Sequence, residues 1–156
     1  MPKLAEPRFY VDADILGLAH ALCIVRNDVT YPGFKGGDKK NGRLRVPCPV
    51  TLTDTDDEVW IHETAKHGWL IITRDTKIQE RTAEINAVRE SGARMVALVG
   101  QDAKTSWDQL EICIRKWVRF EKLLEQPGPF IYAVGATSFR KVSLTPKAQR
   151  TPRMKP

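Results

Sequence analysis

Residues Asp57 to Asp75 read DEVWIHETAKHGWLIITRD, and this stretch decides the fold of the chain. An acidic residue opens a predicted helix that extends to Gly68, and the apolar residues 70–73 then form a short buried strand. A second acid, Asp75, ends that strand, and a third, Asp12, follows the earlier apolar strand 9–11. We therefore expect three carboxylates to meet at one end of a sheet.

The remainder of the chain repeats this alternation of strands and helices. After the strand 9–11, apolar residues at helical spacing predict a helix over 15–23. Further elements are predicted over 76–91 (a helix stopped by Gly92), 94–99 (strand), 106–125 (helix), 130–134 (strand) and 139–144 (edge strand). This order predicts an α/β fold, a three-layer α/β/α sandwich with a mostly parallel central sheet, in one domain over residues 1–144.

Residues 27–53 lack any periodic pattern and are predicted to form a long basic loop. Its glycines and prolines interrupt any long element. Its basic residues are Lys35, Lys39, Lys40, Arg43 and Arg45. Loops of this length in compact domains are usually functional or mobile, so the loop either contacts substrate or is a solvated excursion.

Capping patterns and tryptophans add detail to two of the predicted helices. Thr55 is predicted as the N-cap of the first and Ser106 as the N-cap of the second, because each has Glu or Gln three residues later. Trp107 and Trp117 lie on the apolar stripe of the second helix. We expect both in the core, with a homodimer face as the alternative.

Positive charge is concentrated at the C-terminal end of the chain. The formal net charge is +6, and residues 140–156 contain basic side chains but no acid. Residues 145–156 are predicted to form a basic, flexible tail, which either attracts phosphate backbones or only keeps the protein soluble.

Other features restrict the class of protein. No window contains the roughly 18 apolar residues that a membrane helix needs, and residues 1–4 begin no secretory signal. The cysteines are odd in number and scattered, which argues against a disulfide framework. His20 and Cys23 have the spacing of half a zinc site, but no second pair completes it. We expect a cytoplasmic protein.

The predicted carboxylate cluster needs a cation. Asp12 and Asp75 follow parallel strands, whose carboxyl ends share one edge of the sheet, and the helix that Asp57 opens must start at that edge. Acids in a first helical turn also complement the helix dipole, which is the structural alternative for Asp57. Carboxylates about 4 Å apart repel one another by several kcal/mol per pair. Oxygen ligands select Mg²⁺ or Mn²⁺ over zinc.

These residues resemble the PIN-domain ribonucleases. The likeness rests on the strand that ends in Asp12, the helix opened by Asp57 with Ala65 and Gly68, and the strand exit Thr73-Arg74-Asp75. It covers residues 8–144. The sequence is closest to the PIN-like branch that includes VapC-type toxins around Pro32-Gly33, Cys48-Pro49, Gly68-Trp69 and Thr73-Arg74-Asp75.

The resemblance implies an activity and a set of site residues. PIN nucleases hydrolyse RNA with Mg²⁺ or Mn²⁺, and many are toxins that an antitoxin protein inhibits. The metal ligands implied here are Asp12, Asp57 and Asp75, with Asp14 beside them. The Thr73 hydroxyl is expected to contact a metal ligand without binding the metal itself. The residues implied near substrate phosphates are Thr73, Arg74 and Arg81.

The chain departs from the family pattern at one point, which keeps alternatives open. PIN toxins usually carry a further acid on a helix where this chain has its basic loop, so either Asp14 or Asp56 replaces it or the site is incomplete. An incomplete site predicts a non-catalytic RNA-binding or antitoxin-binding module. Val11 to Ile15 also resembles the opening of haloacid-dehalogenase-type phosphatases, with Asp12 as nucleophile and Asp14 as general acid.

Overall fold

The computed structural model describes residues 2–74 and 81–145 and contains the predicted three-layer α/β/α sandwich. Within those residues the main sheet has the spatial order β3 (Val29–Thr30), β2 (Phe9–Val11), β6 (Leu70–Arg74), β7 (Arg94–Leu98), β8 (Phe130–Val134) and β9 (Phe139–Lys141). All neighbouring strands are parallel except β8 and β9, which pair antiparallel at the edge. The mostly parallel α/β prediction is confirmed.

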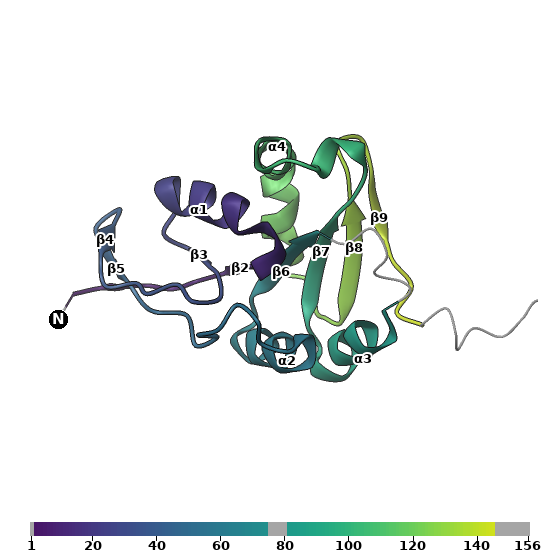
Figure 1. Ribbon diagram of the computed structural model, residues 1–156, viewed down its shortest axis with the longest axis horizontal. Helices are drawn as coiled ribbons and strands as arrows, with labels where there is room; N and C mark the ends of the chain where they lie inside the picture. The colour runs from purple at the N-terminus through teal and green to yellow at the C-terminus, as the bar shows by residue number, and fades with distance from the viewer. Residues whose placement is uncertain (1, 75–80, 146–156) are drawn as a thin grey trace, which may run out of the picture.

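Helices cover both faces of this sheet. Helices α1 (Leu16–Val25) and α4 (Ser106–Leu123) lie on one face, and α2 (Asp57–His67) and α3 (Thr82–Ser91) lie on the other (Figure 1). Short 3-10 turns, η1 (Ala13–Ile15) and η3 (Gln101–Ala103), precede α1 and α4. The first part of the helix predicted over 76–91 lies outside the described residues, and α3 ends as predicted at Gly92, which has a φ of 75°.

Two apolar cores result from the alternation of side chains along the buried strands. Phe9 and Val11 point into the core beneath α1 and α4, whereas Tyr10 points into the core above α2 and α3. Leu70 and Ile72 likewise oppose Ile71. Because successive strand residues face opposite sides, one uninterrupted apolar run supplies both cores.

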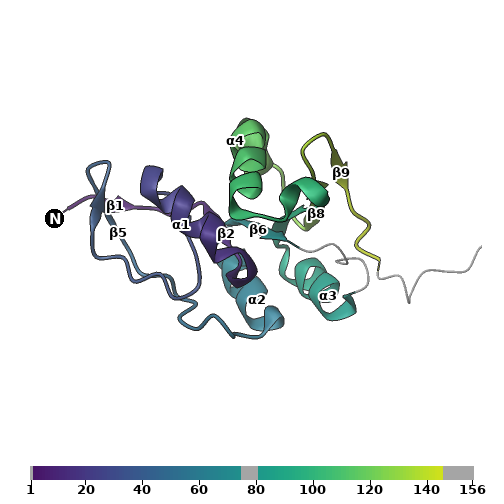
Figure 2. The ribbon, with the colours of Figure 1, turned by 45° about the horizontal axis from the view of Figure 1, so that its top comes forward.

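Part of the predicted long loop forms short strands. The stretch 27–53 contains β3, which joins the main sheet, and β4 (Lys39–Lys40) and β5 (Arg43–Arg45). With β1 (Leu4–Ala5) the last two form a small sheet of order β1-β5-β4, which lies beyond α1 and away from the main sheet (Figures 1 and 2). Strands β4 and β5 consist mostly of exposed or half-buried charged residues, so they carry neither an apolar run nor an alternating pattern that could reveal them.

Both predicted N-caps are wrong by one residue. Helix α2 has Asp56 at its N-cap, and the Thr55 hydroxyl instead donates to the Leu52 carbonyl oxygen at 2.7 Å. Helix α4 has Thr105 at its N-cap, whose side chain accepts from the Asp108 amide at 3.1 Å. In each case a neighbouring turn residue competes for the cap, which sequence spacing alone does not resolve.

The prediction for the tryptophans of α4 is half right. Trp117 is buried against Phe9 and Phe120, as expected. Trp107 is 76% exposed, so its core assignment is wrong. The two residues are ten apart, which at 3.6 residues per turn leaves them about 80° apart around the helix.

Candidate metal site at the carboxyl edge of the sheet

Asp12 lies at the carboxyl end of β2 and is held by two hydrogen bonds. Its Oδ1 accepts from the Ala13 amide at 2.6 Å, and its Oδ2 accepts from the Thr73 hydroxyl at 2.8 Å. The second contact depends on register, since β2 and β6 are parallel with Val11 opposite Ile72, and the next residues on each strand then meet. The carboxylate therefore has one orientation at the sheet edge.

Asp57 reaches the same region from the first turn of α2. The residue is exposed, and its Oδ1 accepts from the Trp60 indole Nε1 at 2.9 Å. The Trp60 ring is buried and stacks on Tyr10, which is two residues before Asp12 on β2. Trp60 thus anchors the Asp57 side chain to the core above β2. Sequence reasoning missed this role, although the i, i+3 spacing of the two residues permitted it.

The charges of the two carboxylates interact. Burial raises the pKa of Asp12, the negative charge of Asp57 raises it further, and the hydrogen bonds from Thr73, Ala13 and Asp14 oppose this effect. The pKa of Tyr10 is raised mainly by burial, with further contributions from Cys48 and from the charges of Asp12 and Asp57. Both carboxylates therefore act on the same buried end of β2.

The other candidate ligands are Asp75, Asp14 and Asp56. Asp75 lies outside the described residues. Asp14 is exposed on η1, next to Asp12, with which its side chain interacts. Asp56 is the exposed N-cap of α2. Within residues 2–74 and 81–145, no group of three or more His, Cys, Asp or Glu side chains is close enough to hold a metal ion.

The residues predicted to lie near substrate phosphates have partners within the protein. The Thr73 side chain is buried and bonded to Asp12. The Arg74 guanidinium donates to the carbonyl oxygen of Ala103 in η3. Arg81 pairs with Glu84 at 3.7 Å and is 57% exposed. Of the two arginines, the structure leaves Arg81 more open to solvent.

A hollow lined by the basic loop lies beside α1. It has a volume of about 480 Å³, and its walls include His20, Tyr31, Phe34, Lys35 and Arg45. The Tyr31 ring packs edge to face against both His20 and Phe34, with centroids 5.2 Å apart in each contact. Arg45 also pairs with Asp38 and stacks over Phe34. The loop is thus held in place by aromatic and ionic contacts.

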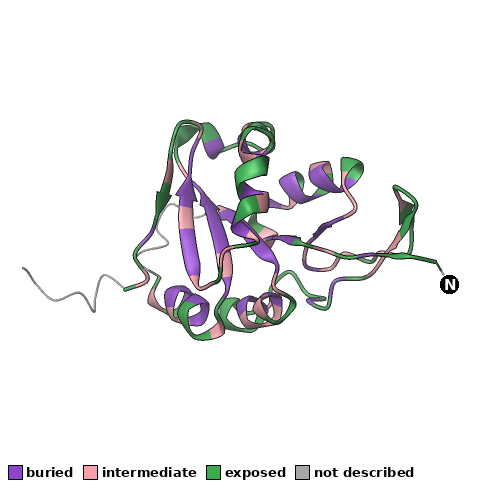
Figure 3. Ribbon diagram, turned by 180° about the vertical axis from the view of Figure 1, so that it is seen from behind, coloured by how far each residue is buried: buried purple, intermediate pink, exposed green. Residues whose placement is uncertain are grey.

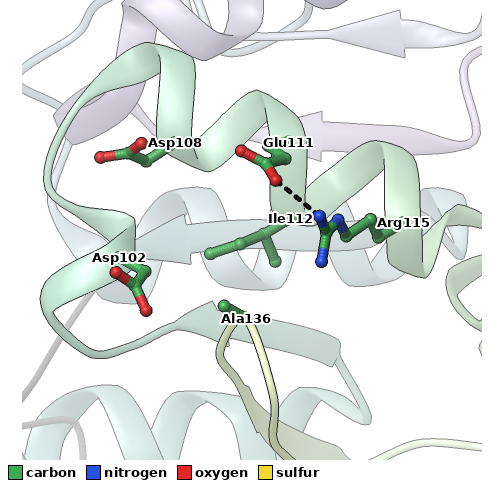
Figure 4. A pocket seen from close by; sticks show the side chains of 6 residues that line it. All are labelled: Asp102, Asp108, Glu111, Ile112, Arg115 and Ala136. Atoms are coloured by element: carbon green, nitrogen blue, oxygen red, sulfur yellow. Dashed lines mark ion pairs between the residues drawn. The ribbon is translucent and has the colours of Figure 1, made fainter.

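A second group of acids lies at the same edge of the sheet but further along it. Figure 4 shows Asp102 of η3 with Asp108 and Glu111 of α4 around a pocket of about 210 Å³. Glu111 pairs with Arg115 at 2.9 Å, and both side chains are more than half exposed. Asp108 in the first turn of α4 is favourable for the helix dipole. Asp108 and Glu111 thus have structural roles in α4, as Asp12 has at the N-cap of η1.

A comparison with models of known protein families identifies the family of this chain. The model of a family described as PIN like domain matches residues 7–100. The chain belongs to the PIN-like domain family. The match includes β2, α2 and β6, and hence the edge that carries Asp12 and Asp57, while α4, β8 and β9 lie beyond it. This PIN-like chain has no match among curated proteins or solved structures.

Membership of the PIN-like family supports the nuclease resemblance over the phosphatase one. In the part of the chain that the structure describes, no helix has the length and apolar character required to cross a membrane.

Proposed function

We propose that the protein is a Mg²⁺- or Mn²⁺-dependent endoribonuclease whose metal ligands are Asp12, Asp57 and Asp75. The observation that carries the proposal is the Asp12 carboxylate, oriented by Thr73 and Ala13 beside Asp57 at the carboxyl edge of a parallel sheet. PIN-like membership adds independent support, because the matched residues contain all three acids.

The residues present fit a hard divalent cation. The donors are carboxylate oxygens, and two carboxylates that raise each other's energy without a cation are stabilised when one binds. No lysine or arginine of the described residues pairs with Asp12, so the negative charge there is not already neutralised by an ion pair. Asp14 interacts with Asp12 on the same turn, but Asp12, Asp14 and Asp57 are not by themselves close enough to hold a metal ion, so the proposal depends on Asp75.

The side chains of the chain have distinct roles in this proposal. Thr73 fixes the rotamer of Asp12, and Trp60 fixes that of Asp57, so both ligands are oriented before metal binds. Arg81 and the basic loop neutralise flanking phosphates, with Arg74 contributing from its position beside η3. A bound Mg²⁺ or Mn²⁺ would supply an acidic water and stabilise charge on the phosphodiester.

The biological role that we propose is that of a VapC-type toxin. The nuclease would inhibit growth or translation until a cognate antitoxin covers its acidic edge. The likeness of Gly68-Trp69 and Thr73-Arg74-Asp75 to that branch supports this role. Induction of the wild-type chain in a bacterial host should arrest growth, and induction of Asp12→Asn should not. Equal growth of the two cultures would contradict the toxin role while leaving the nuclease to the assay below.

The test of the nuclease is cleavage of a fluorescently labelled, mixed-sequence RNA in Mn²⁺ and in EDTA. The wild-type chain should cleave only with metal, and Asp12→Asn should lose at least about 100-fold in rate. Asp102→Asn, from the second acidic group on the same edge, is the matched control and should stay within about twofold. Wild-type cleavage by Asp12→Asn, or undiminished cleavage in EDTA, would refute the proposal.

One observation favours a second candidate, a non-catalytic RNA-binding module. The chain has its basic loop where PIN toxins usually carry a further acid, so its acidic set lacks one member of the family pattern. The module predicts RNA binding that weakens with salt and is the same with Mn²⁺ and with EDTA. Filter binding in both buffers, run beside the cleavage assay, separates the two functions.

A further inference from the structure

The hollow lined by the basic loop lies at the carboxyl end of β3, next to the proposed metal site. Strands β2 and β3 are parallel, with Tyr10 opposite Thr30. Continuing this register by one residue brings the Tyr31 backbone to about 4.8 Å from that of Val11, the residue before Asp12. The Tyr31 side chain packs against the core beneath α1. It therefore lies on the α1 side of the edge that contains Asp12.

The chain also connects two walls of this hollow to the proposed metal ligands. On one wall, Leu16 begins α1 and lies four residues after Asp12. On another, Thr53 lies four residues before Asp57. Four residues span at most about 14 Å, so each of these wall residues has its Cα within that distance of a proposed ligand's Cα. A short stretch of one RNA strand can therefore occupy the hollow and the metal site together.

The hollow offers flat aromatic surface. His20 is exposed on α1, and its ring stands at 73° to the Tyr31 ring. Two rings at this angle form a corner, in which a flat group can lie against one ring while its edge meets the other. The volume of about 480 Å³ is typical of small-molecule sites. Proteins bind unstacked bases on aromatic side chains of this kind, including Tyr and His.

Contacts within the protein hold this aromatic surface in place. The Arg45 guanidinium donates to the Cys23 carbonyl oxygen at 2.7 Å and to the Asp38 carboxylate at 3.0 Å. It also lies 5.3 Å from the centroid of the Phe34 ring, which packs against Tyr31. Arg45 is thus a structural clamp of the loop. Because the rings are ordered before a ligand binds, binding has a lower entropic cost.

The charge around the hollow suits the phosphates on either side of a bound base. Lys35 is exposed on its wall, and Lys39 of β4 and Arg43 of β5 are exposed beyond it. Asp38, an acid of the same wall, is already paired with Arg45. In Figure 3 the loop beside α1 is mostly exposed or half-buried, unlike the strands of the main sheet. Exposed bases beside aromatic rings are the combination that binds single-stranded nucleic acid.

We propose that this hollow is a base-binding subsite, in which an unstacked base of single-stranded RNA lies against Tyr31 and His20 while the neighbouring phosphodiester reaches Asp12. This subsite rests on the proposed function, because it positions the RNA that the metal site would cleave. It makes single-stranded RNA the substrate class, since the bases of a duplex are stacked and paired and cannot enter the hollow. Lys35 holds the backbone beside the bound base.

The first experiment measures, by fluorescence anisotropy in EDTA, how the full chain binds a labelled single-stranded RNA of about ten nucleotides. His20→Ala and Tyr31→Leu should each weaken binding about tenfold, because each removes a stacking surface. His67→Ala is the matched control and should bind as wild type does. His67 is also exposed and contacts an aromatic ring, that of Trp69, but it lies at the end of α2 opposite to Asp57.

Duplex RNA of the same sequence provides the second measurement. The wild-type chain should bind the single strand about tenfold more tightly than the duplex, and both variants should reduce this preference. Thermal melting establishes that the variants fold, and His20→Ala, at an exposed position, decides the test if Tyr31→Leu does not. Wild-type affinity of the folded variants, an equal loss in His67→Ala, or equal binding of single strand and duplex by wild type overturns the subsite.

The subsite and the nuclease can fail separately. Binding in EDTA does not depend on catalysis, so a chain that cleaves no RNA refutes the nuclease and leaves the subsite to the binding measurements. If the chain does cleave RNA, His20→Ala should raise KM about tenfold and change kcat less than about twofold, because stacking holds substrate and transition state alike. A His20→Ala variant that lowers kcat with KM unchanged overturns the subsite.

Discussion

Two groups of carboxylates lie along the same edge of the sheet. They differ in their hydrogen-bond and ion-pair partners and in their exposure to solvent. Asp12 and Asp57, at β2 and α2, are oriented by hydrogen bonds from Thr73 and Trp60. The group of Asp102, Asp108 and Glu111 surrounds an exposed pocket near the start of α4. There Glu111 has Arg115 as a counter-charge.

The difference shows that a count of acids does not identify a metal site. The α4 group contains more carboxylates among the described residues, yet its charges are solvated or paired. The Asp12 group is smaller, but burial and a like charge raise the pKa of Asp12 while hydrogen bonds keep its orientation. A bound cation offsets negative charge that has no counter-charge within the protein. We therefore expect metal at the first group and not at the second.

The largest effect should separate the two groups by activity. Asp57→Asn removes a proposed ligand and should lower metal-dependent RNA cleavage at least about 100-fold. Asp108→Asn, also an acid in a first helical turn, should change the rate less than about twofold. Initial rates in Mn²⁺ measure both. Equal losses in the two variants would mean that the comparison between the groups is wrong.

Metal binding should stabilise the protein through the first group alone. At a Mn²⁺ concentration about 100 times its dissociation constant, the free energy of unfolding should rise by about 2.7 kcal/mol. The rise should disappear in Asp12→Asn and persist in Asp102→Asn. Thermal unfolding with and without Mn²⁺ gives the shift, and a rise retained by Asp12→Asn would locate the cation elsewhere.

The Thr73 hydroxyl should matter because it orients Asp12. Thr73→Val removes that hydrogen bond with little change in volume and should lower metal affinity or activity about tenfold. Thr64→Val is the control, because the Thr64 hydroxyl is also buried but donates to the Ile61 carbonyl oxygen within α2. A Mn²⁺ titration of the cleavage rate distinguishes lost affinity from lost turnover.

The smallest expected effect is that of Asp12→Asn on the stability of the metal-free protein, measured in EDTA. The pKa of Asp12 is raised in the folded state, so the folded protein binds this proton more tightly than the unfolded chain does. Stability then falls as pH rises above the ordinary carboxyl value of 3.8. Asp12→Asn should therefore be more stable than wild type at pH 7 in EDTA and should have a higher melting temperature.

The same melting curves below pH 3.8 should coincide, because both states of the wild-type chain then hold the proton. If the variant is less stable than wild type at pH 7 in EDTA, the Asp12 carboxylate stabilises the metal-free fold, and the prediction is wrong.

Much of the fold was predictable because its signals are local. The apolar runs 9–11, 70–72 and 130–134 are continuous, as is typical of buried parallel strands, and each predicted strand appears in the main sheet. The missed short strands depend on contacts between distant residues. Strand β1 pairs with β5, where Leu4 lies opposite Leu44, and no local pattern reports such a pairing.

The candidate site also combines features that local sequence predicts with contacts between distant residues. The positions of Asp12 and Asp57 at element ends could be read from the chain, since strand and helix boundaries are local properties. The partners that hold them could not all be read in this way. Trp60 is a neighbour of Asp57 on one helix turn, but Thr73 is 61 residues from Asp12 in sequence.

The amino-acid sequence by itself determined the layered α/β architecture and the acids at the ends of its elements, because hydrophobic period and capping act over a few residues. Only the tertiary structure decided that Thr73 bonds Asp12, since this contact depends on the register of β2 against β6. It also decided that Trp107 is exposed while Trp117 is buried, because the packing angle of α4 on the sheet selects which side of the helix faces the core.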